Sequence, residues 1–318
     1  MPPSLTVLLL GGTGSIGRAT AAALGAAGHR VVAVVRPGGS APAGCTAWPG
    51  DVTAPGTVAA ALGAHRCDAV VSCLASRTGA PDDARAVDHR AHSLALQAAV
   101  AAGVGRFVLV SAICVQRPRL AFQQAKLAFE SELQAAPLAW TILRPTAFFK
   151  SLSGQVDRVR QGRPFLVFGD GRVTACKPIS DADLGRFVAQ VLTDPATAGR
   201  ILPVGGPGPA ITPLDRAAML ERLPGRPVRV RHVPLALMDA IVAVLGALAP
   251  LSRRLAARAE FARIGRYYAR ESMLVWNPAT GAYDAQATPE FGTDRLADHY
   301  AALLAGQATD DRGAHAVF

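Results

Sequence analysis

The feature that most constrains the fold of this chain is a glycine-rich segment, LLLGGTGSIGRAT at residues 8–20, which joins a short apolar run to an alanine-rich stretch. Such a turn needs residues that tolerate positive φ, and a phosphate can approach its backbone closely only where no Cβ intervenes. The first amides of the following helix add hydrogen-bond donors and a positive dipole end. The segment therefore predicts a dinucleotide-phosphate site at the start of a β-α-β unit. Its residues are Gly11, Gly12, Thr13, Gly14, Ser15, Ile16 and Gly17.

Apolar runs and alanine-rich stretches alternate through the first half of the chain. They predict strands at 5–10, 30–35, 69–74, 106–111 and 139–145, and helices at 15–27, 84–102 and 120–134. Continuous apolar strands separated by helices indicate a parallel sheet that helices cover on both faces. The predicted fold class is therefore α/β, a doubly wound parallel sheet of the Rossmann type.

Beyond about residue 146 this alternation weakens. Helices are predicted at 151–161, 180–192 and 213–222 and over 234–270 with a break near Pro250, and one strand is predicted at 200–206. We expect residues 1–150 to form an NADPH-binding Rossmann domain and residues 151–318 to form a smaller, mostly helical substrate-binding lobe. The lobe is expected to dock on the first domain and to interleave partly with it.

The residues that follow three of the predicted strands indicate which dinucleotide is bound. Arg36 ends the second strand, where an NAD site usually carries an acidic residue for the ribose hydroxyls. An arginine there favours the 2′-phosphate of NADPH through charge-assisted hydrogen bonds. Asp51 and Val52 lie in the segment GDVT, where the carboxylate is expected to meet the adenine amino group. Leu74 and Ala75 lie in SCLAS and are expected beside the adenine ribose and the nicotinamide.

The segment SAICVQRPRLAFQQAKLAFESEL at residues 111–133 is typical of a short-chain dehydrogenase active site, with one replacement. Such enzymes carry Tyr-x-x-x-Lys on a helix, whereas here Phe122 precedes Lys126. Ser111 is expected near the cofactor, but Ala112 follows it, which argues against a Ser-Tyr proton relay. Carbonyl reduction needs a strong donor for the developing alkoxide. Reduction of a carbon–carbon double bond conjugated to a large π system can spread the charge and take its proton later, so the missing phenol favours ene-reduction.

Several long segments carry a closer resemblance. RPTAFFKSLSGQV at 144–156, GRPFLVFGDGRVTACKPISDADL at 162–184 and ESMLVWNPATGAYDAQATPEFGTDRLADHY at 271–300 strongly resemble the divinyl chlorophyllide a 8-vinyl-reductases, a family of atypical short-chain dehydrogenase/reductases. The resemblance runs from about residue 5 to about residue 304, and in this family Phe-x-x-x-Lys is the expected form. It implies an enzyme that uses NADPH to reduce the 8-vinyl group of divinyl chlorophyllide, or protochlorophyllide, to ethyl in chlorophyll or bacteriochlorophyll biosynthesis.

The resemblance also implies roles for individual residues. Gly11, Gly14 and Gly17 would contact the pyrophosphate, Arg36 the 2′-phosphate, and Lys126, the expected catalytic residue, the nicotinamide ribose. The residues expected on the substrate side are Phe148, Phe149, Lys150, Cys176 and Lys177. For the two phenylalanines ordinary core packing is the alternative, and for Cys176 an inert buried thiol is the alternative.

Two other functions share parts of these patterns. NmrA-like sensors bind a dinucleotide without catalysis and usually lack the tyrosine, but they need neither Lys126 nor a pocket for a macrocycle. Isoflavone-reductase-like enzymes also use NADPH on small phenolic substrates. The segments ACKPIS and ESMLVW are not expected in that group.

Composition indicates where the protein works and what it meets. The net charge is +10, yet no nucleic-acid-binding signature occurs, so phosphates, carboxylates or an anionic membrane are the expected partners. The five cysteines show no pairing pattern and no metal-ligand spacing, which indicates a reducing cytoplasm and no metal site. Residues 253–270 predict an amphipathic, arginine-rich helix after the apolar segment 233–251. This pair predicts either one wall of a pigment pocket or peripheral contact with the photosynthetic membrane.

Overall fold

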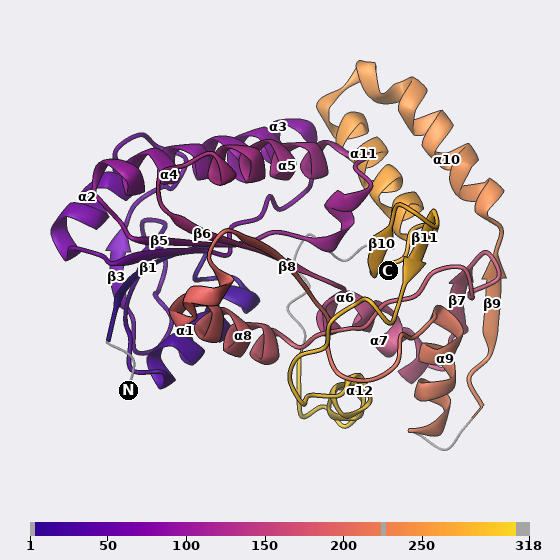
Figure 1. Cartoon of the computed structure of the whole chain (residues 1–318). Helices are drawn as coiled ribbons and strands as arrows, with labels where there is room; N and C mark the ends of the chain where they lie inside the picture. The colour runs from indigo at the N-terminus through magenta and orange to yellow at the C-terminus, as the bar shows by residue number, and fades with distance from the viewer. Residues whose placement is uncertain (1–3, 224–226, 310–318) are drawn as a thin grey trace.

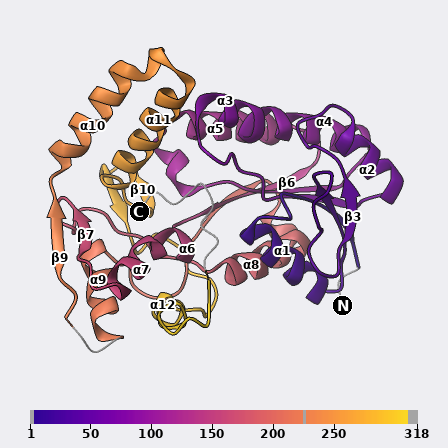
Figure 2. The same cartoon turned by 180° about the vertical axis from the view of Figure 1, so that it is seen from behind.

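The computed structural model describes residues 4–223 and 227–309. The outermost parts of the two predicted domains, 1–3 and 310–318, and the short segment 224–226 lie outside these described residues. The elements that follow are those of the described part of the chain (Figures 1 and 2).

A parallel seven-stranded sheet forms the centre of the molecule, with the strand order β3-β2-β1-β4-β5-β6-β8. Its strands are β1 (Thr6–Leu10), β2 (Arg30–Val35), β3 (Thr46–Pro49), β4 (Ala69–Ser72), β5 (Arg106–Val110), β6 (Ala139–Pro145) and β8 (Arg200–Val204). All neighbouring pairs run parallel, with Val7 beside Val31 and Ala69, and Val108 beside Val71 and Thr141. This order is that of a Rossmann sheet, so the predicted fold class is confirmed.

Helices cover both faces of the sheet (Figure 1). One face carries α2 (Thr57–His65), α4 (His92–Ala101) and α5 (Ala121–Gln134), and the other carries α1 (Ser15–Ala26) and α8 (Asp181–Thr193). The apolar strands divide accordingly, because successive side chains point to opposite faces. Leu8 and Leu10 pack in the core with α2, α4 and α5, while Val7 and Leu9 pack in the core with α1 and α8.

The segment predicted as one helix at 84–102 is more complex. A short α3 (Pro81–Asp83) leads into a π-helix, η1 (Ala84–Ala91), and only then into α4. A π-helix is wider than an α-helix because its hydrogen bonds join residues five apart. Such segments are rare and often occur at functional sites. A short 3₁₀ turn, η2 (Ile113–Gln116), follows β5 and precedes α5.

The second half of the chain contributes to the central sheet as well as to a separate layer. β8 completes the sheet beside β6, and α8 packs against α1. The remaining elements form a lobe at one end of the sheet: α6 (Phe149–Leu152), η3 (Ser153–Gln155), α7 (Val156–Arg160), α9 (Pro213–Arg222), α12 (Leu296–Leu304), and two small sheets, β7–β9 and β10–β11. The strands β7 (Phe165–Phe168) and β9 (Val230–Val233) are parallel, whereas β10 (Val275–Asn277) and β11 (Ala282–Asp284) are antiparallel.

Two antiparallel helices project at the lobe end of the molecule, away from α2 and β3 (Figures 1 and 2). These are α10 (Leu235–Leu248) and α11 (Arg253–Tyr268), which a turn at η5 (Ala249–Leu251) connects. The break near Pro250 is therefore where the sequence predicted it. None of the helices in the described residues combines the length and apolarity that crossing a membrane requires.

Candidate functional site

The glycine-rich loop joins β1 to α1 in a conformation that depends on missing Cβ atoms. Gly11 has a φ of +75°, and a Cβ there would lie 2.8 Å from the carbonyl of Cys73, at the end of β4. A Cβ on Gly17 would lie 2.1 Å from the carbonyl oxygen of Gly11. Gly14, in contrast, would place a Cβ near nothing closer than that oxygen, at 3.5 Å, and is exposed to solvent beside Thr13. Gly11 and Gly17 shape the loop, while Gly14 leaves an open approach to its backbone.

The amino end of α1 has the properties of an anion site. Gly14 is the N-cap residue, no side chain caps the helix, and no acidic residue lies in its first turn. The first amides of a helix have no intrahelical partner and carry the positive end of the dipole. Ile16 packs its side chain in the core beneath the loop. Lys150 reaches the same place, where its Nζ donates a hydrogen bond to Oγ of Ser15. The loop therefore fits a pyrophosphate, with a lysine predicted for the substrate side placed beside it.

The residues predicted for the adenosine half lie at the carboxyl ends of β2 and β3. Arg36 follows β2 directly and is exposed. Asp51 and Val52 follow β3, which pairs with β2, so they lie next to the same edge. The backbone amide and hydroxyl of Thr53 both donate hydrogen bonds to Asp51 and, together with Arg36, hold the pKa of its carboxyl below the usual range. The structure thus groups an exposed guanidinium, which forms no ion pair within the described residues, and a carboxylate at the carboxyl ends of β2 and β3.

A buried ion pair lies at the centre of the site. Lys126, 8% exposed, places its Nζ 2.9 Å from Oδ1 of Asp88, which is 1% exposed. The same oxygen accepts a hydrogen bond from the amide of Ser76, in the loop after β4 that also carries the predicted Leu74 and Ala75. Burial opposes ionisation of Asp88, but Lys126 and these hydrogen bonds outweigh it and hold the pKa of the carboxyl below its usual range. The pair is therefore a lysine ammonium held by a carboxylate.

The π-helix η1 positions Asp88 and the residues behind it. Asp88 is one of the buried residues of η1, and α4 begins directly after that segment with His92. His92 is buried, with Nδ1 3.0 Å from the carbonyl oxygen of Val87 and Nε2 2.8 Å from Oγ of Ser72. Burial first, and then the nearby Lys126 charge, lowers the pKa of His92 to about 4. The histidine is thus neutral at pH 7, donates from Nδ1 to Val87 and accepts from Ser72, and leaves the single positive charge to Lys126.

Phe122 lies one helical turn before Lys126 on α5 and is half-buried. It contacts the loop after β4 at Gly79, where a Cβ would lie 3.4 Å from the Phe122 ring and 2.9 Å from Ile264 of α11. Gly79 has a φ of +66°, so glycine is favoured there for its conformation as well as for space. The loop, α5 and α11 therefore meet at Phe122, the position that a tyrosine occupies in tyrosine-dependent enzymes.

Ser111 follows β5, and its hydroxyl is hydrogen-bonded to a residue of α5 other than Lys126. Its Oγ donates a hydrogen bond to Oε1 of Glu130, a buried carboxylate whose other oxygen pairs with Arg144. Ser111 is 6% exposed. Its hydroxyl is thus committed to a structural network under β5 and β6, and its predicted contact with cofactor stays a prediction.

The residues predicted on the substrate side are dispersed. Phe148 packs in the core with α8, and Phe149, 6% exposed, packs in the core of the lobe beside His299. Cys176 is buried, its backbone pairs with Ile211, and burial raises the pKa of its thiol to about 11. Lys177 is buried and places its Nζ 2.7 Å from Glu290. These contacts are those of packing and internal ion pairing, and the predicted pigment contacts stay predictions.

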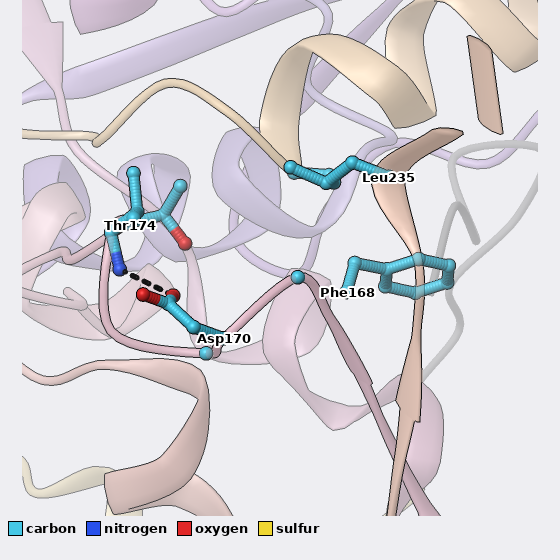
Figure 3. A pocket seen from close by; sticks show the side chains of 8 residues that line it. Phe168, Asp170, Thr174 and Leu235 are labelled. Carbon is cyan, nitrogen blue, oxygen red and sulfur yellow. Dashed lines mark hydrogen bonds between the residues drawn. The ribbon is translucent and has the colours of Figure 1, made fainter. Parts of the chain in front are cut away.

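Two cavities lie beside the projecting helices. The larger, of about 540 Å³, is lined by Thr78, Phe168 and mostly apolar residues of α10 and α11. The smaller, of about 270 Å³, lies between Leu235 and the turn from Phe168 to Thr174 (Figure 3). Its only carboxylate among the lining residues, Asp170, accepts hydrogen bonds from the amides of Arg172 and Val173 and so serves the turn itself. The larger cavity is the better candidate for a ligand.

Sequence reasoning missed the buried partner of Lys126. Asp88 lies in a polar stretch, DHRAH, that reads as a solvated helix face. A faint signal was available, because a carboxylate there is followed at helical spacing by His92, in the helix that precedes β5. The sequence also did not indicate that Gly79 contacts Phe122, or that Arg258 lines the cavity between α10 and α11.

Comparisons with known proteins identify the family and the fold of the chain. Residues 11–195 match a protein-family model described as NAD(P)H-binding. The whole chain is 46% identical to the divinyl chlorophyllide a 8-vinyl-reductase of Oryza sativa subsp. indica and covers 83% of its length. It is 40% identical, over 95% of its length, to the corresponding Arabidopsis thaliana protein, of which it covers 78%. The NADPH-complexed quinone oxidoreductase of Escherichia coli has the same fold, with a TM-score of 0.68 and 19% identity over 93% of this chain and 99% of that one.

Proposed function

This chain belongs to the family of the divinyl chlorophyllide a 8-vinyl-reductases, and we infer from that membership that it reduces the 8-vinyl group of divinyl chlorophyllide to ethyl in chlorophyll or bacteriochlorophyll biosynthesis. The observation that carries this function is the 46% identity to a named reductase over the full length of the chain. It is an oxidoreductase that binds NAD(P)H through its Rossmann sheet. Its substrate is a chlorophyllide tetrapyrrole.

The cofactor is NADPH, which supplies a hydride to the vinyl group. The exposed backbone at Gly14 and the uncapped first turn of α1 would hold the pyrophosphate, and Lys150 would add a positive charge at the same place. Arg36 would bind the 2′-phosphate, since it is exposed next to Asp51 and forms no ion pair within the described residues. Lys126 would donate to the nicotinamide ribose, in an orientation that Asp88 maintains.

The pairing of Lys126 with Asp88 explains how the site works without a tyrosine. In a tyrosine-dependent enzyme the lysine charge serves to lower the pKa of the phenol. Here the neighbour one turn earlier is Phe122, which neither donates nor accepts a proton, and the lysine charge is balanced by a buried carboxylate. The site orients a hydride donor beside an apolar surface, which suits a C=C bond whose developing charge spreads into a conjugated ring system.

Neither alternative function is favoured. The reductases of Oryza sativa subsp. indica, Zea mays and Arabidopsis thaliana match 95–100% of the chain, including α10, α11 and the lobe, which a dinucleotide sensor would not need for binding alone. A small phenolic substrate would leave the apolar cavity of about 540 Å³ largely unfilled.

The purified protein is expected to convert divinyl to monovinyl chlorophyllide in the presence of NADPH, with a shift in pigment absorption. Phe122→Tyr should give no gain in kcat, because no alkoxide forms that a phenol would have to protonate. The check is the initial rate of the wild type and the variant at saturating NADPH. A rise of about tenfold or more, equivalent to about 1.4 kcal/mol of barrier, would show that a general acid limits the reaction.

We also propose that the protein binds peripherally to an anionic membrane through α10. Leu237, Ile241, Val244 and Leu248 recur at helical spacing on this helix and are 38–59% exposed, and no residue of α10 is buried. Leu251 in the adjoining turn is 73% exposed. Such a stripe on a projecting helix is an interaction surface rather than a core face. Exposed Arg254 lies just beyond the turn, where lipid phosphates would attract it.

Wild-type protein is expected to sediment with anionic vesicles at low salt and to be released as salt is added. Val244→Glu and Leu248→Glu should each weaken partitioning about fivefold, because each removes an apolar contact of about 1 kcal/mol. Neither residue lines the cavity beside α11. Val100→Glu is the matched control, since Val100 is 39% exposed but lies on α4 at the other end of the molecule. Wild-type protein that stays in the supernatant would exclude the membrane contact.

A further inference from the structure

We propose that the larger cavity between α10 and α11 is the binding site of the tetrapyrrole macrocycle, and that Arg258 at its rim pairs with the propionate carboxylate of the substrate. The proposal rests on the proposed function and gives it a place in the molecule. The sequence predicted these helices to be either a membrane surface or one wall of a pigment pocket, and the proposal assigns them the second role. It places pigment binding at residues other than Phe148, Phe149, Cys176 and Lys177.

The cavity has the size and lining for an apolar ring system. Its volume of about 540 Å³ lies within the range of about 300–1,000 Å³ that is usual for ligand pockets. One wall comes from α10 and the other from α11, and the residues concerned are Met238, Ile241, Leu245, Ala257, Phe261 and Ala262. Apart from Arg258 and Phe261, the residues of α11 that line the cavity are small: Ala257, Ala262 and Gly265.

Arg258 is the arginine that lines the cavity, and it differs from Arg263, Arg266 and Arg270 in forming no ion pair within the described residues. Arg263 pairs with Glu260, and both Arg266 and Arg270 pair with Asp239 of α10. Arg258 is exposed, lines the cavity, and forms no ion pair with any residue of the described part of the chain. A carboxylate on an apolar ring would therefore find one uncommitted guanidinium at the edge of the pocket, and charge-assisted pairing would set the orientation of the ring.

The cavity is next to the place where the hydride arrives. Thr78 lines the cavity, and the following residue, Gly79, contacts Phe122 one helical turn before Lys126. Ile264, which lies against Gly79, belongs to the same helix that forms one cavity wall. A single loop segment thus separates the proposed pigment site from the nicotinamide side of the cofactor site. The missing tyrosine leaves an apolar surface on the cofactor side of that segment.

The test measures pigment binding by chlorophyllide fluorescence, with NADP⁺ present so that no hydride can be transferred. Two probes are compared, chlorophyllide a and its methyl ester, which lacks the free carboxylate. Arg258→Gln is expected to raise the Kd of the acid about fivefold, as for one partly exposed ion pair, and to leave that of the ester unchanged. Arg254→Gln is the matched control, because Arg254 is exposed on the same helix but does not line the cavity.

Filling the cavity tests the apolar part of the proposal. Ala262→Phe should raise the Kd of both probes by about tenfold, as overpacking costs of about 1–3 kcal/mol imply. Met238→Asp on the opposite wall is a second variant with the same expected direction, and retained NADP⁺ affinity shows that each variant is folded. If all three cavity variants bind chlorophyllide a with wild-type affinity while the wild type reduces the pigment, the site is overturned but not the function.

A wild type that neither binds nor reduces pigment would overturn both. If Arg258→Gln weakens the affinities for chlorophyllide a and for its methyl ester equally, the carboxylate pairing is overturned. Cavity variants that lose vesicle binding but keep the wild-type affinity for pigment would assign the cavity to lipid.

Discussion

Replacing Asp88 with asparagine is expected to lower the free energy of unfolding by about 3 kcal/mol, because it leaves the buried Lys126 ammonium without its counter-charge. The variant keeps the shape of the side chain and the acceptor for Lys126 and Ser76, so the loss comes from the missing charge and from the amide group that replaces the second oxygen. The other oxygen, Oδ2, is buried and has no hydrogen-bond partner among the described residues, and an amide nitrogen there would gain none. Urea unfolding monitored by circular dichroism gives the value.

A double variant separates the charge from the packing. Asp88→Asn combined with Lys126→Met removes both charges and should regain most of the lost stability, to within about 1 kcal/mol of the wild type. Asp82→Asn is the surface control, since its ion pair with Arg85 joins side chains that are 92% and 74% exposed. Its effect should stay within about 0.5 kcal/mol.

Cofactor binding shows whether the pair does more than stabilise the fold. Lys126→Met in the double variant should bind NADPH more weakly than the wild type even though stability has returned, because the donor to the ribose is gone. An Asp88→Asn protein that unfolds at the wild-type urea midpoint would show that the ion pair does not hold the site together.

The first half of the fold was largely predictable because its signals are local. The predicted strands at 30–35 and 139–145 agree with β2 and β6. The apolar runs are short, continuous and separated by alanine-rich helices, a pattern that buried parallel strands share. The lobe was less predictable. β9 reads VRHV with three exposed residues, so its pairing with β7 depends on tertiary contact rather than on sequence pattern.

The site divides in the same way. The glycine loop, Arg36 and Lys126 follow from motifs, because their spacing within one β-α-β unit or one helix is encoded locally. The contact of Lys126 with Asp88, and that of Lys150 with Ser15, join segments from different parts of the chain and leave no periodic signature. The apolar sequence of α10 predicted a helix, but whether that helix is buried, lines a pocket or meets solvent depends on what packs against it, which only the structure shows.

Replacing Gly14 with alanine is expected to lower NADPH affinity on the order of a hundredfold, the equivalent of about two charge-assisted hydrogen bonds to phosphate. Gly14 has φ −71° and ψ 165°, which any residue adopts, and its added Cβ would meet only the Gly11 oxygen at an ordinary 3.5 Å. The fold should therefore tolerate the change, and stability should shift by less than about 1 kcal/mol, because the lower entropy of the unfolded chain offsets the loss of a favoured N-cap residue. The new methyl group would instead occupy the exposed side of the loop, where a pyrophosphate approaches.

Two further variants give this prediction its contrast. Gly17→Ala should destabilise the protein itself, because its Cβ would lie 2.1 Å from the Gly11 oxygen and 2.7 Å from the Cα of Gly12. Arg36→Asp should leave stability unchanged and weaken NADPH by about tenfold or more while sparing NADH, since only NADPH carries the 2′-phosphate. Titrations of each variant with both cofactors, beside urea unfolding, distinguish the three effects. A Gly14→Ala protein with wild-type affinity for both cofactors would place the pyrophosphate elsewhere, because a site built on this loop leaves no room for the methyl group.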